Sequence, residues 1–543
     1  MKAHFSVLLT LIFGGQLYTA DADLTAIRNY IAARAGMEAY QGDTKCGIRY
    51  QMDVIRLWDE LSQQEQHLWL ADVKQDTARS EKLITPSGHF MLHWDNQGDN
   101  MVPQTDVSGN GIPDFIDSAA VIFDRVWDIE VSQLGYALPV GPDGLPIDLH
   151  HVYFTDLPVY GEPVPERTVT IDGNVKYISY MQIDNDFSDF FTTGLEALKV
   201  TAAHEFHHIL QLGYNVRQND FFFYEMTSTW MEEKIYPEIN DYFQYMDILF
   251  FYMSNTEFDY YAGAYSYGNA LYVIMLDQIY GADIVRNIWE SLLGRPLSMN
   301  ALVLDGLRDV LARAPYNSSW LASLQEYGKW LHFTGDRTIP QMYFPDAAYF
   351  PKIRIARSDT YIFPDQIPES LNITELANRY IRLIGLRGSD LNLTVSASTF
   401  SEGGFSLLSN QEATPFYHLG ESFASSNMIE DTVIVQLVNA QYYARDFGLD
   451  ISSTATTDIT MGPNPVRVMD GEREVLFRNI PEDGHIYIYN AAGLEVAHIE
   501  ESASPNRIWN LQNRNGEPVA SGIYIYLVKS AEQEHRGKFA IIK

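Results

Sequence analysis

The sequence predicts an α+β protein in which a mainly helical region is followed by β-rich modules. Up to about residue 340, apolar residues recur every three or four positions, as in "DVIRLWDELSQQEQHLWLADVKQ", which is typical of amphipathic helices. Beyond about residue 345, short segments such as "LNLTVSAST" and "DTVIVQLV" alternate between apolar and polar residues. This alternation indicates the antiparallel strands of a β-sandwich. Helices followed by strands are typical of the α+β class.

Length and composition exclude several kinds of protein. The chain has 543 residues, too many for one hydrophobic core, so we expect several domains. Hydrophobic residues make up 46% and aromatic residues 13%, which indicates a folded chain and not a disordered one. The net charge of -34 repels phosphate backbones, so we expect no nucleic-acid partner.

The N-terminus has the pattern of a cleavable secretory signal. Lys2 precedes the apolar run 5–15, and the small residues Ala20 and Ala22 flank Asp21. The alternative is a buried first helix. No later segment has the 18 or more apolar residues of a membrane span, so we expect no span in the mature chain. We therefore expect a protein that is secreted or held at the outer cell surface.

We expect five segments along the chain. A Ser/Thr-rich joint at 452–465 separates the last module from the strands before it. The expected segments are a signal peptide at 1–22, a helical N-terminal segment at 23–84 that could be a pro-segment, a mainly helical domain with few strands at 85–342, a β-sandwich domain at 343–455 and a small immunoglobulin-like β-sandwich module at 456–543.

The stretch "AAHEFHHILQL" at 202–212 has the spacing of a zinc site. On a helix, His204 and His208 lie on one face because they are four residues apart, and Glu205 can reach a water on the metal. In this His-Glu-x-x-His arrangement two neutral imidazoles bind Zn²⁺ and the glutamate acts as general base. The alternative is a pair of ordinary core histidines. We assign His207 to a neighbouring polar or rim position, since pairing it with His204 leaves His208 without a role.

A catalytic zinc needs a third protein ligand and one open position. The sequence offers no third histidine six residues after His208, where Tyr214 stands. The next predicted helix, "FFFYEMTSTWMEEKIYP", carries the candidates Glu225, Glu232 and Glu233. The first two of these are seven residues apart and therefore share a helix face.

The motifs "AHEFHH" and "YEMTSTWMEE" resemble those of the gluzincin metallopeptidases, the class of thermolysin and aminopeptidase N. The resemblance implies a zincin-like catalytic domain with Glu225 as the third ligand. It also implies a tyrosine that stabilises the tetrahedral oxyanion. "AYSYGNALYVIML" at 264–276 is similar to the corresponding aminopeptidase segment, which puts Tyr265 in this role, with Tyr267 as the alternative. The group that orients His204 through its other ring nitrogen stays open.

The loop "DVSGNGIPDFID" at 106–117 has the spacing of a calcium loop. Oxygen-bearing side chains stand at loop positions 1, 3, 5, 9 and 12, and Gly111 at position 6 provides a sharp turn. The alternative is an Asx/Gly turn that caps the helix that follows. Bound Ca²⁺ would brace a chain that can form no intrachain disulfide. The predicted ligands are Asp106, Ser108, Asn110, Asp114 and Asp117.

The only cysteine, Cys46, lies in "TKCGIRY", ahead of the predicted catalytic region. A thiolate is a good zinc ligand and could occupy the open position of the site in a proform. "KCG" is faintly similar to the Arg-Cys-Gly core of the matrixin cysteine switch. The alternative is a buried thiol that acts only as a small apolar residue.

Residues 459–543 resemble the C-terminal sorting domain of proteins exported by the type IX secretion system. The similarity lies in "GPNPV" at 462–466, "IYIYNAAGLEV" at 486–496, "NGEPVASGIYIYLV" at 515–528 and the final "GKFAIIK". It implies the type IX secretion machinery as a partner, with passage across an outer membrane followed by release or surface attachment. The alternative is a generic adhesion or carbohydrate-binding module.

Together these patterns predict an exported zinc endopeptidase that acts on a protein or peptide substrate; no Gly-x-Met-Glu-Asn exopeptidase motif occurs. His204, His208 and Glu225 would hold Zn²⁺. Glu205 would take a proton from the bound water as it attacks a peptide carbonyl, and Tyr265 would donate to the oxyanion. The alternative is a cell-surface, calcium-dependent adhesin or binding protein with a non-catalytic zinc site. A closed site of that kind needs four protein ligands, and no fourth is evident from the spacing.

Overall fold

The computed structural model of the chain forms two compact units. One contains the described residues up to Leu249 together with Asp259–Ser323, and the other contains Phe250–Phe258 and Leu324–Lys543. The predicted signal peptide lies, up to residue 19, outside the described residues. The structure describes residues 20–37, 45–76, 78–141, 143–261, 263–296, 302–362, 367–397, 402–426, 428–454, 459–468 and 473–543.

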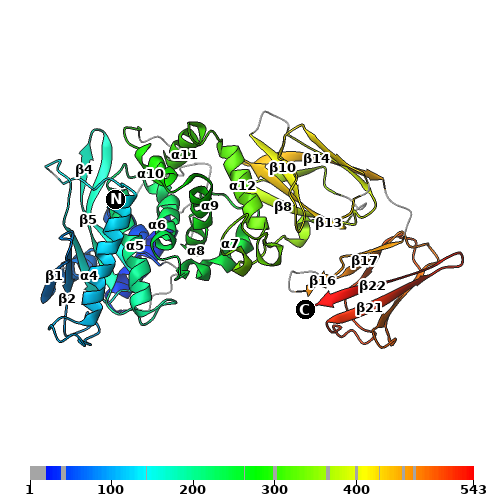
Figure 1. Cartoon of the computed structure of the whole chain (residues 1–543), viewed down its shortest axis with the longest axis horizontal. Helices are drawn as coiled ribbons and strands as arrows, with labels where there is room; N and C mark the ends of the chain where they lie inside the picture. The colour runs from blue at the N-terminus through cyan, green and yellow to red at the C-terminus, as the bar shows by residue number, and fades with distance from the viewer. Residues whose placement is uncertain are drawn as a thin grey trace, which may run out of the picture. The chain divides into compact units, whose positions relative to one another are not determined.

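A five-stranded sheet with the order β1-β2-β3-β5-β4 forms one layer of the first unit (Figure 1). The pairs β2–β3 and β3–β5 are parallel, whereas β1 and β4 pair antiparallel with their neighbours and form the two edges. Burial alternates along the central strands β2 and β3, so that Phe90, Leu92, Val152 and Phe154 are buried on one face while the residues between them are half-buried on the other. The strands are β1 (Glu81–Ile84), β2 (Phe90–Trp94), β3 (His150–Thr155), β4 (Gly161–Ile171) and β5 (Asn174–Asp184).

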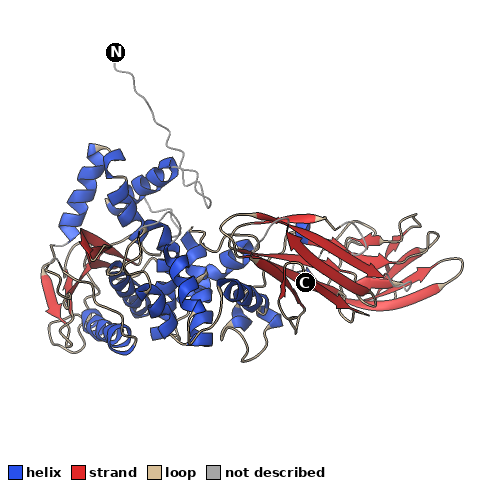
Figure 2. Ribbon diagram, turned by 90° about the horizontal axis from the view of Figure 1, so that it is seen from above, coloured by secondary structure: helices blue, strands red, loops and turns tan. Residues whose placement is uncertain are grey.

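This sheet overturns the predicted mainly helical, zincin-like domain, although the α+β class is correct. Figure 2 shows strands as well as helices in the first unit. The β4–β5 hairpin was missed because its strands carry many polar and half-exposed side chains, which hide the apolar alternation. The dipeptide Asp172-Gly173 is nevertheless a turn signal in the sequence. In the structure both residues have positive φ, 50° and 79°, as a two-residue hairpin turn requires.

Helices cover the sheet and supply most of the candidate site. Helix α5 packs against β4, β5, α4 and α6, so it is surrounded by other elements. In the first unit the helices are α1 (Ala20–Arg34), α2 (Ile48–Arg56), α3 (Gln63–Asp76), α4 (Asp114–Trp127), which continues as a π-helix (Asp128–Gln133), α5 (Gly194–Leu212), α6 (Phe221–Ile235), α8 (Gly263–Gly268), α9 (Ala270–Tyr280), α10 (Asp283–Glu290) and α11 (Leu302–Ala312); α7 (Met246–Tyr252) and α12 (Trp320–His332) cross from one unit to the other.

The N-terminal helices α1–α3 form a small cluster with its own apolar core around Ile27, Tyr30 and Trp69. The cluster is attached to the start of the edge strand β4. The Tyr30 hydroxyl donates to Glu162 Oε2 at 2.6 Å, and Arg34 forms a buried ion pair with the same carboxylate. This contact brings the predicted pro-segment beside the sheet.

The second unit contains two β modules, each with its own core. In the first, the sheets β11-β10-β13-β8-β6 and β12-β9-β14-β7 enclose a cluster that includes Leu393, Phe405 and Val435. In the second, the sheets β15-β17-β20 and β16-β22-β21-β18-β19 enclose Phe477, Trp509 and other apolar residues.

The bounds of these strands are β6 (Thr360–Ile362), β7 (Ser370–Ile373), β8 (Ala377–Ile384), β9 (Asp390–Ala397), β10 (Gly403–Leu408), β11 (Tyr417–His418), β12 (Ser422–Ser425), β13 (Thr432–Asn439), β14 (Arg445–Thr454), β15 (Thr460–Gly462), β16 (Val466–Arg467), β17 (Val475–Arg478), β18 (His485–Asn490), β19 (Glu495–Ile499), β20 (Arg507–Trp509), β21 (Gly522–Lys529) and β22 (Glu534–Ile542). Within the part of the chain that the structure describes, no helix combines the length and the apolar character needed to cross a membrane.

Candidate metal centre

Helix α5 places the His-Glu-x-x-His residues deep in the first unit. The helix begins at Gly194 and ends at Leu212, and Gly213 follows it. Nearly every residue from 197 onward is buried, because neighbouring elements cover α5 on several sides. His204 and His208 are fully buried, and Glu205 is 1% exposed. Buried polar side chains in an apolar setting need specific partners, and these side chains have them.

Three side chains converge as ligands of one metal ion would. The Nε2 atoms of His204 and His208 lie 3.0 Å apart. Glu225 Oε2, from helix α6, lies 3.2 Å from Nε2 of His204 and 3.4 Å from Nε2 of His208. Donors about 2.1 Å from a tetrahedral zinc are about 3.4 Å from one another. Two imidazoles and a carboxylate with this spacing therefore fit Zn²⁺, and Glu225 Oε1 has no hydrogen-bond partner within the described structure.

Each histidine has a partner that fixes its ring. His204 Nδ1 donates to Glu232 Oε1 at 2.7 Å, and His208 Nδ1 donates to Gln211 Oε1 at 2.7 Å. With Nδ1 protonated, both rings leave the Nε2 lone pair for a metal. Glu232, a candidate ligand from its spacing, thus contacts the outer nitrogen of His204 and not the point where the ligands converge. Glu232 stands two turns after Glu225 on the same face of α6, so it reaches His204 as well. It is therefore the group that orients the His204 ring, a role that the sequence did not assign.

His207 lies away from the convergence point and is fully buried, not at a rim. Its Nδ1 is 2.8 Å from Oε2 of Glu130, which the π-helix supplies, and its ring meets Tyr136 edge-on. Burial raises the pKa of Glu130 and lowers the pKa of His207, so burial favours the neutral form of both groups. His207 is therefore part of the packing behind α5 and not a ligand.

Glu205 lies beside the ligands with one oxygen unsatisfied. Its Oε2 accepts a hydrogen bond from Cys46 Sγ at 3.3 Å, whereas its Oε1 has no partner among the described residues. Burial raises the pKa of this carboxyl to about 8, against the opposing effect of His204. Gly161, at the start of β4, allows this close approach, since a Cβ there would lie 2.8 Å from Glu205 Cγ.

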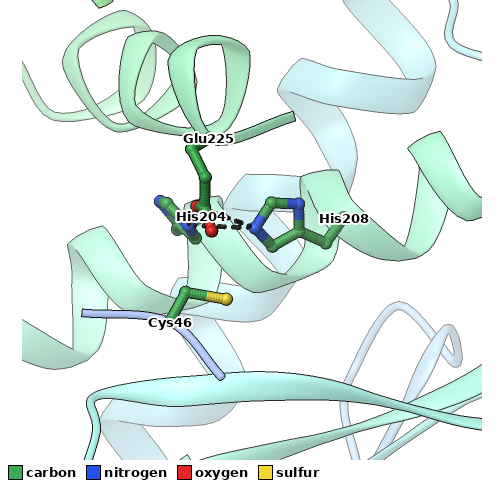
Figure 3. A group of neighbouring side chains, drawn as sticks. All are labelled: Cys46, His204, His208 and Glu225. Atoms are coloured by element: carbon green, nitrogen blue, oxygen red, sulfur yellow. Dashed lines mark hydrogen bonds and ion pairs between the residues drawn. The ribbon is translucent and has the colours of Figure 1, made fainter. Parts of the chain in front are cut away.

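Cys46 reaches the same place from the N-terminal segment. Its Sγ belongs, with one atom each of His204, His208 and Glu225, to a group whose ligand atoms all lie within 4.8 Å of one another. Figure 3 shows Glu225 and Cys46 approaching the two rings from opposite sides. Burial, and then the Glu205 and Glu225 carboxylates, raise the pKa of the thiol well above its usual value. The fold thus brings the Cys46 thiol beside the three predicted ligands.

The two tyrosines considered for the oxyanion have different surroundings. The Tyr267 ring lies 6.1 Å from that of His204, and its hydroxyl accepts a hydrogen bond from the Cys46 backbone N–H at 3.1 Å. Tyr265 is buried on the same helix, α8, with its ring against Tyr260. The oxyanion role stays a prediction for both, and the contact with Cys46 connects Tyr267 to the centre.

The predicted calcium loop is exposed and satisfied by its own atoms. Asp106 accepts hydrogen bonds from the backbone N–H groups of Gly109 and Gly111, which lower the pKa of this carboxyl. Asp114 accepts from the Val107 N–H, and Asp117 from the Asn110 amide. Ser108 donates to Asp106. These bonds describe an Asx/Gly turn before α4, and the calcium site stays a prediction.

Comparisons with known proteins cover little of the chain. A protein family of unknown function (DUF6055) matches residues 190–296, the segment that holds α5 and α6. No curated protein matches. Similar solved structures include PorZ, a surface component of the type-IX secretion system of Porphyromonas gingivalis, with 19% identity over 20% of this chain and 15% of that chain and a TM-score of 0.15. Latent PorU of the same organism has 17% identity over 29% of this chain and 19% of that chain, with a TM-score of 0.13. An adhesin domain of Epf from Streptococcus pyogenes has 10% identity over 32% of this chain and 72% of that chain, with a TM-score of 0.13. The chain thus spans less than a fifth of PorZ and of PorU, and scores this low carry no argument about fold or function.

Proposed function

We propose that this protein is a zinc-dependent endopeptidase. The observation that carries the proposal is the convergence of His204, His208 and Glu225 on one point, with the carboxylate of Glu205 beside them. Two imidazoles and one carboxylate, each imidazole with a hydrogen-bonded outer partner, form the three-ligand set of hydrolytic zinc sites. The resemblance to gluzincin metallopeptidases supports peptide hydrolysis as the reaction.

The chain's own residues have separate tasks in this proposal. When bound, Zn²⁺ supplies a Lewis acid that polarises the attacking water and the peptide carbonyl. Glu205 takes the proton of that water at the carboxylate and passes it to the leaving amine. Tyr267, or Tyr265, donates a hydrogen bond to the oxygen that gains negative charge. The side chains of His204, Glu205, His208 and Glu225 are at most 1% exposed, so the site is shielded from bulk solvent.

A second candidate function has one observation in its favour. With Cys46 the centre has four protein donors, which is the number in closed structural zinc sites. In that case the protein would be a surface binding protein whose zinc braces the N-terminal helices against the rest of the unit. The two functions differ in whether the protein cleaves peptide bonds in any form.

Removal of the metal separates the two. We expect the full chain, or the chain trimmed just ahead of β1 (Glu81–Ile84), to hydrolyse casein, to lose this activity in a zinc chelator, and to regain it with Zn²⁺ but not with Ca²⁺ alone. The measurement is the release of soluble peptide, with bound zinc determined on the same samples. Zinc-loaded protein that cleaves nothing in either form would favour the closed, non-catalytic site.

We also propose that the last module directs export by the type IX secretion machinery, on the strength of the motifs quoted for residues 459–543. A chain truncated after residue 455 should then accumulate inside the producing cell, because it lacks the proposed sorting signal. The amount of protein in the culture medium and on the cell surface, compared with the full chain, measures this. Normal export of the truncated chain contradicts the assignment.

A further inference from the structure

We propose that Cys46 is a fourth ligand of this metal centre, and that the three residues that include it, the 45–47 strap, hold the peptidase latent until the strap is withdrawn. This inference rests on the proposed function and concerns the regulation of the same site. The strap consists of Lys45, Cys46 and Gly47.

The donor atoms are of the right kind and close together. The Sγ of Cys46 and the ligand atoms of the two histidines and Glu225 all lie within 4.8 Å of one another, and all four residues are buried (Figure 3). Thiolate and imidazole ligands on one tetrahedral zinc are about 3.3–3.6 Å apart. The four donors therefore lie around a single point, and only a small closing movement is needed for all of them to bind one ion.

A second observation points to a cation here, independently of the thiol. Oxygen Oε1 of Glu225 and oxygen Oε1 of Glu205 are both buried without a hydrogen-bond partner among the described residues. Both side chains are only 1% exposed. Glu225 contacts both imidazoles through its other oxygen, and Glu205 contacts Cys46 beside them. Buried carboxylate oxygens are normally satisfied, so two unsatisfied ones in this cluster indicate a missing positive charge.

The strap also lies along the sheet edge that an extended peptide would use. Gly47 N–H donates to the Gly161 carbonyl at 3.0 Å, and Tyr160 N–H donates to the Lys45 carbonyl at 3.0 Å. Strand β4 is an edge of the sheet, and peptides commonly bind by adding a strand to such an edge. Because Gly161 also packs beneath Glu205, a substrate at this edge would bring its carbonyl to the metal. The strap therefore excludes substrate as well as filling the fourth position.

Two anchors hold the strap in place. Lys45 Nζ lies 2.6 Å from Glu232 Oε2 and 2.5 Å from Asp241 Oδ2, and all three side chains are at most 2% exposed. A buried ion pair of this kind is costly to break from one side, since the carboxylates would stay buried without a counter-charge. Gly47 fits where a larger residue does not: an added Cβ would lie 2.6 Å from the Tyr30 hydroxyl.

The chemistry of closing and opening balances without an oxidant or reductant. On closing, the Cys46 thiol gives up its proton, with Glu205 Oε2 as the nearest acceptor at 3.3 Å, and the thiolate displaces water from the metal. On opening, the thiolate is protonated again, water returns and Glu205 is released. The strap thus engages the metal and the general base at the same time.

Cobalt substitution tests the ligand without any mutation. In the full chain loaded with Co²⁺ in place of Zn²⁺, we expect a near-ultraviolet sulfur-to-cobalt charge-transfer band. The chain has a single cysteine, so the band reports Cys46 alone. Replacement of Cys46 by Ser should remove the band while Co²⁺ stays bound through the other three ligands. A Co²⁺-loaded wild-type chain without the band overturns the ligation.

Peptide hydrolysis by intact chains tests latency. The variant Cys46→Ser, which keeps the ion pairs of Lys45, should hydrolyse casein about 10-fold or more faster than the intact wild type, because the open fraction of the chains limits the rate. Lys82→Met, at an exposed lysine on β1, is the control and should leave the rate unchanged. Rates for Cys46→Ser that equal those of the wild type or fall below them overturn latency. If the band is present and no form, trimmed or mutated, cleaves casein, the ligation stands, while the latency fails together with the proposed function.

Discussion

Replacing Glu205 by Gln is expected to lower casein hydrolysis by about 10²–10⁴-fold, the usual contribution of a general base, while zinc stays bound. Glutamine has the same shape but cannot accept a proton at neutral pH. Within the described structure Glu205 accepts a hydrogen bond from Cys46, and no hydrogen bond joins it to the three ligand side chains. Bound zinc per chain should therefore be unchanged. Both quantities are to be measured in whichever form of the wild-type chain, intact or trimmed, hydrolyses casein.

Glu196→Gln provides the matched control for this experiment. Glu196 lies in the first turn of the same helix and is exposed, so its amide variant should behave like the wild type. Retained hydrolysis in Glu205→Gln would contradict the proposed mechanism. Loss of hydrolysis together with loss of zinc would show that Glu205 supports the site and would leave its role as a base unsupported.

In the Cys46→Ser background, Glu225→Ala is expected to abolish metal binding. The variant removes the carboxylate that lies within 3.4 Å of both imidazole Nε2 atoms, which leaves only the two histidines as protein ligands. Glu232→Gln should weaken zinc binding by only about 10–100-fold, since Glu232 acts through the orientation of His204. Zinc per chain after dialysis, and competition with a chelator of known affinity, measure the two effects.

Glu225→Ala should lose more zinc than Glu232→Gln, and this order distinguishes a metal ligand from the partner of a ligand. Both glutamates are 1% exposed on α6, so burial alone gives no reason for a difference between them. Glu233→Ala, at a half-buried position on the same helix, serves as the control for handling and folding. A Glu225→Ala chain that keeps its zinc, or a Glu232→Gln chain that loses more zinc than Glu225→Ala, would make Glu232 the ligand instead.

The fold was predictable where the local sequence pattern determines the secondary structure. The periods of α5 and α6 lie in uninterrupted windows of 19 and 15 residues, and both helices form as expected. The sheet was not predictable in this way. Its strands β2, β3 and β5 pair in parallel across long connections, and the β4–β5 hairpin carries polar residues on the faces that reach solvent. Pairing across such distances depends on the whole unit and leaves a weak local pattern.

The residues of the site were likewise predictable only where they are close in the sequence. His204, Glu205 and His208 are four residues apart or less, so helix geometry alone predicted that they lie together. Glu225 came from a resemblance, and the structure places it at the convergence point. Tyr267 was named only as an alternative, and its hydroxyl accepts a hydrogen bond from the Cys46 N–H, on a helix, α8, that packs against α6.

What the sequence determined by itself is the local chemistry: a helix that presents two imidazoles and one carboxylate on neighbouring faces, and a following helix with acidic residues seven positions apart. What only the tertiary structure decided is which distant groups meet that chemistry. Glu232 became the partner of His204, and Cys46, 159 residues before Glu205, came within hydrogen-bond distance of it. The physical reason is that helix periodicity fixes neighbours within a few residues, whereas the pairing of residues 45–47 with the edge of β4 depends on packing between segments that are far apart in the chain.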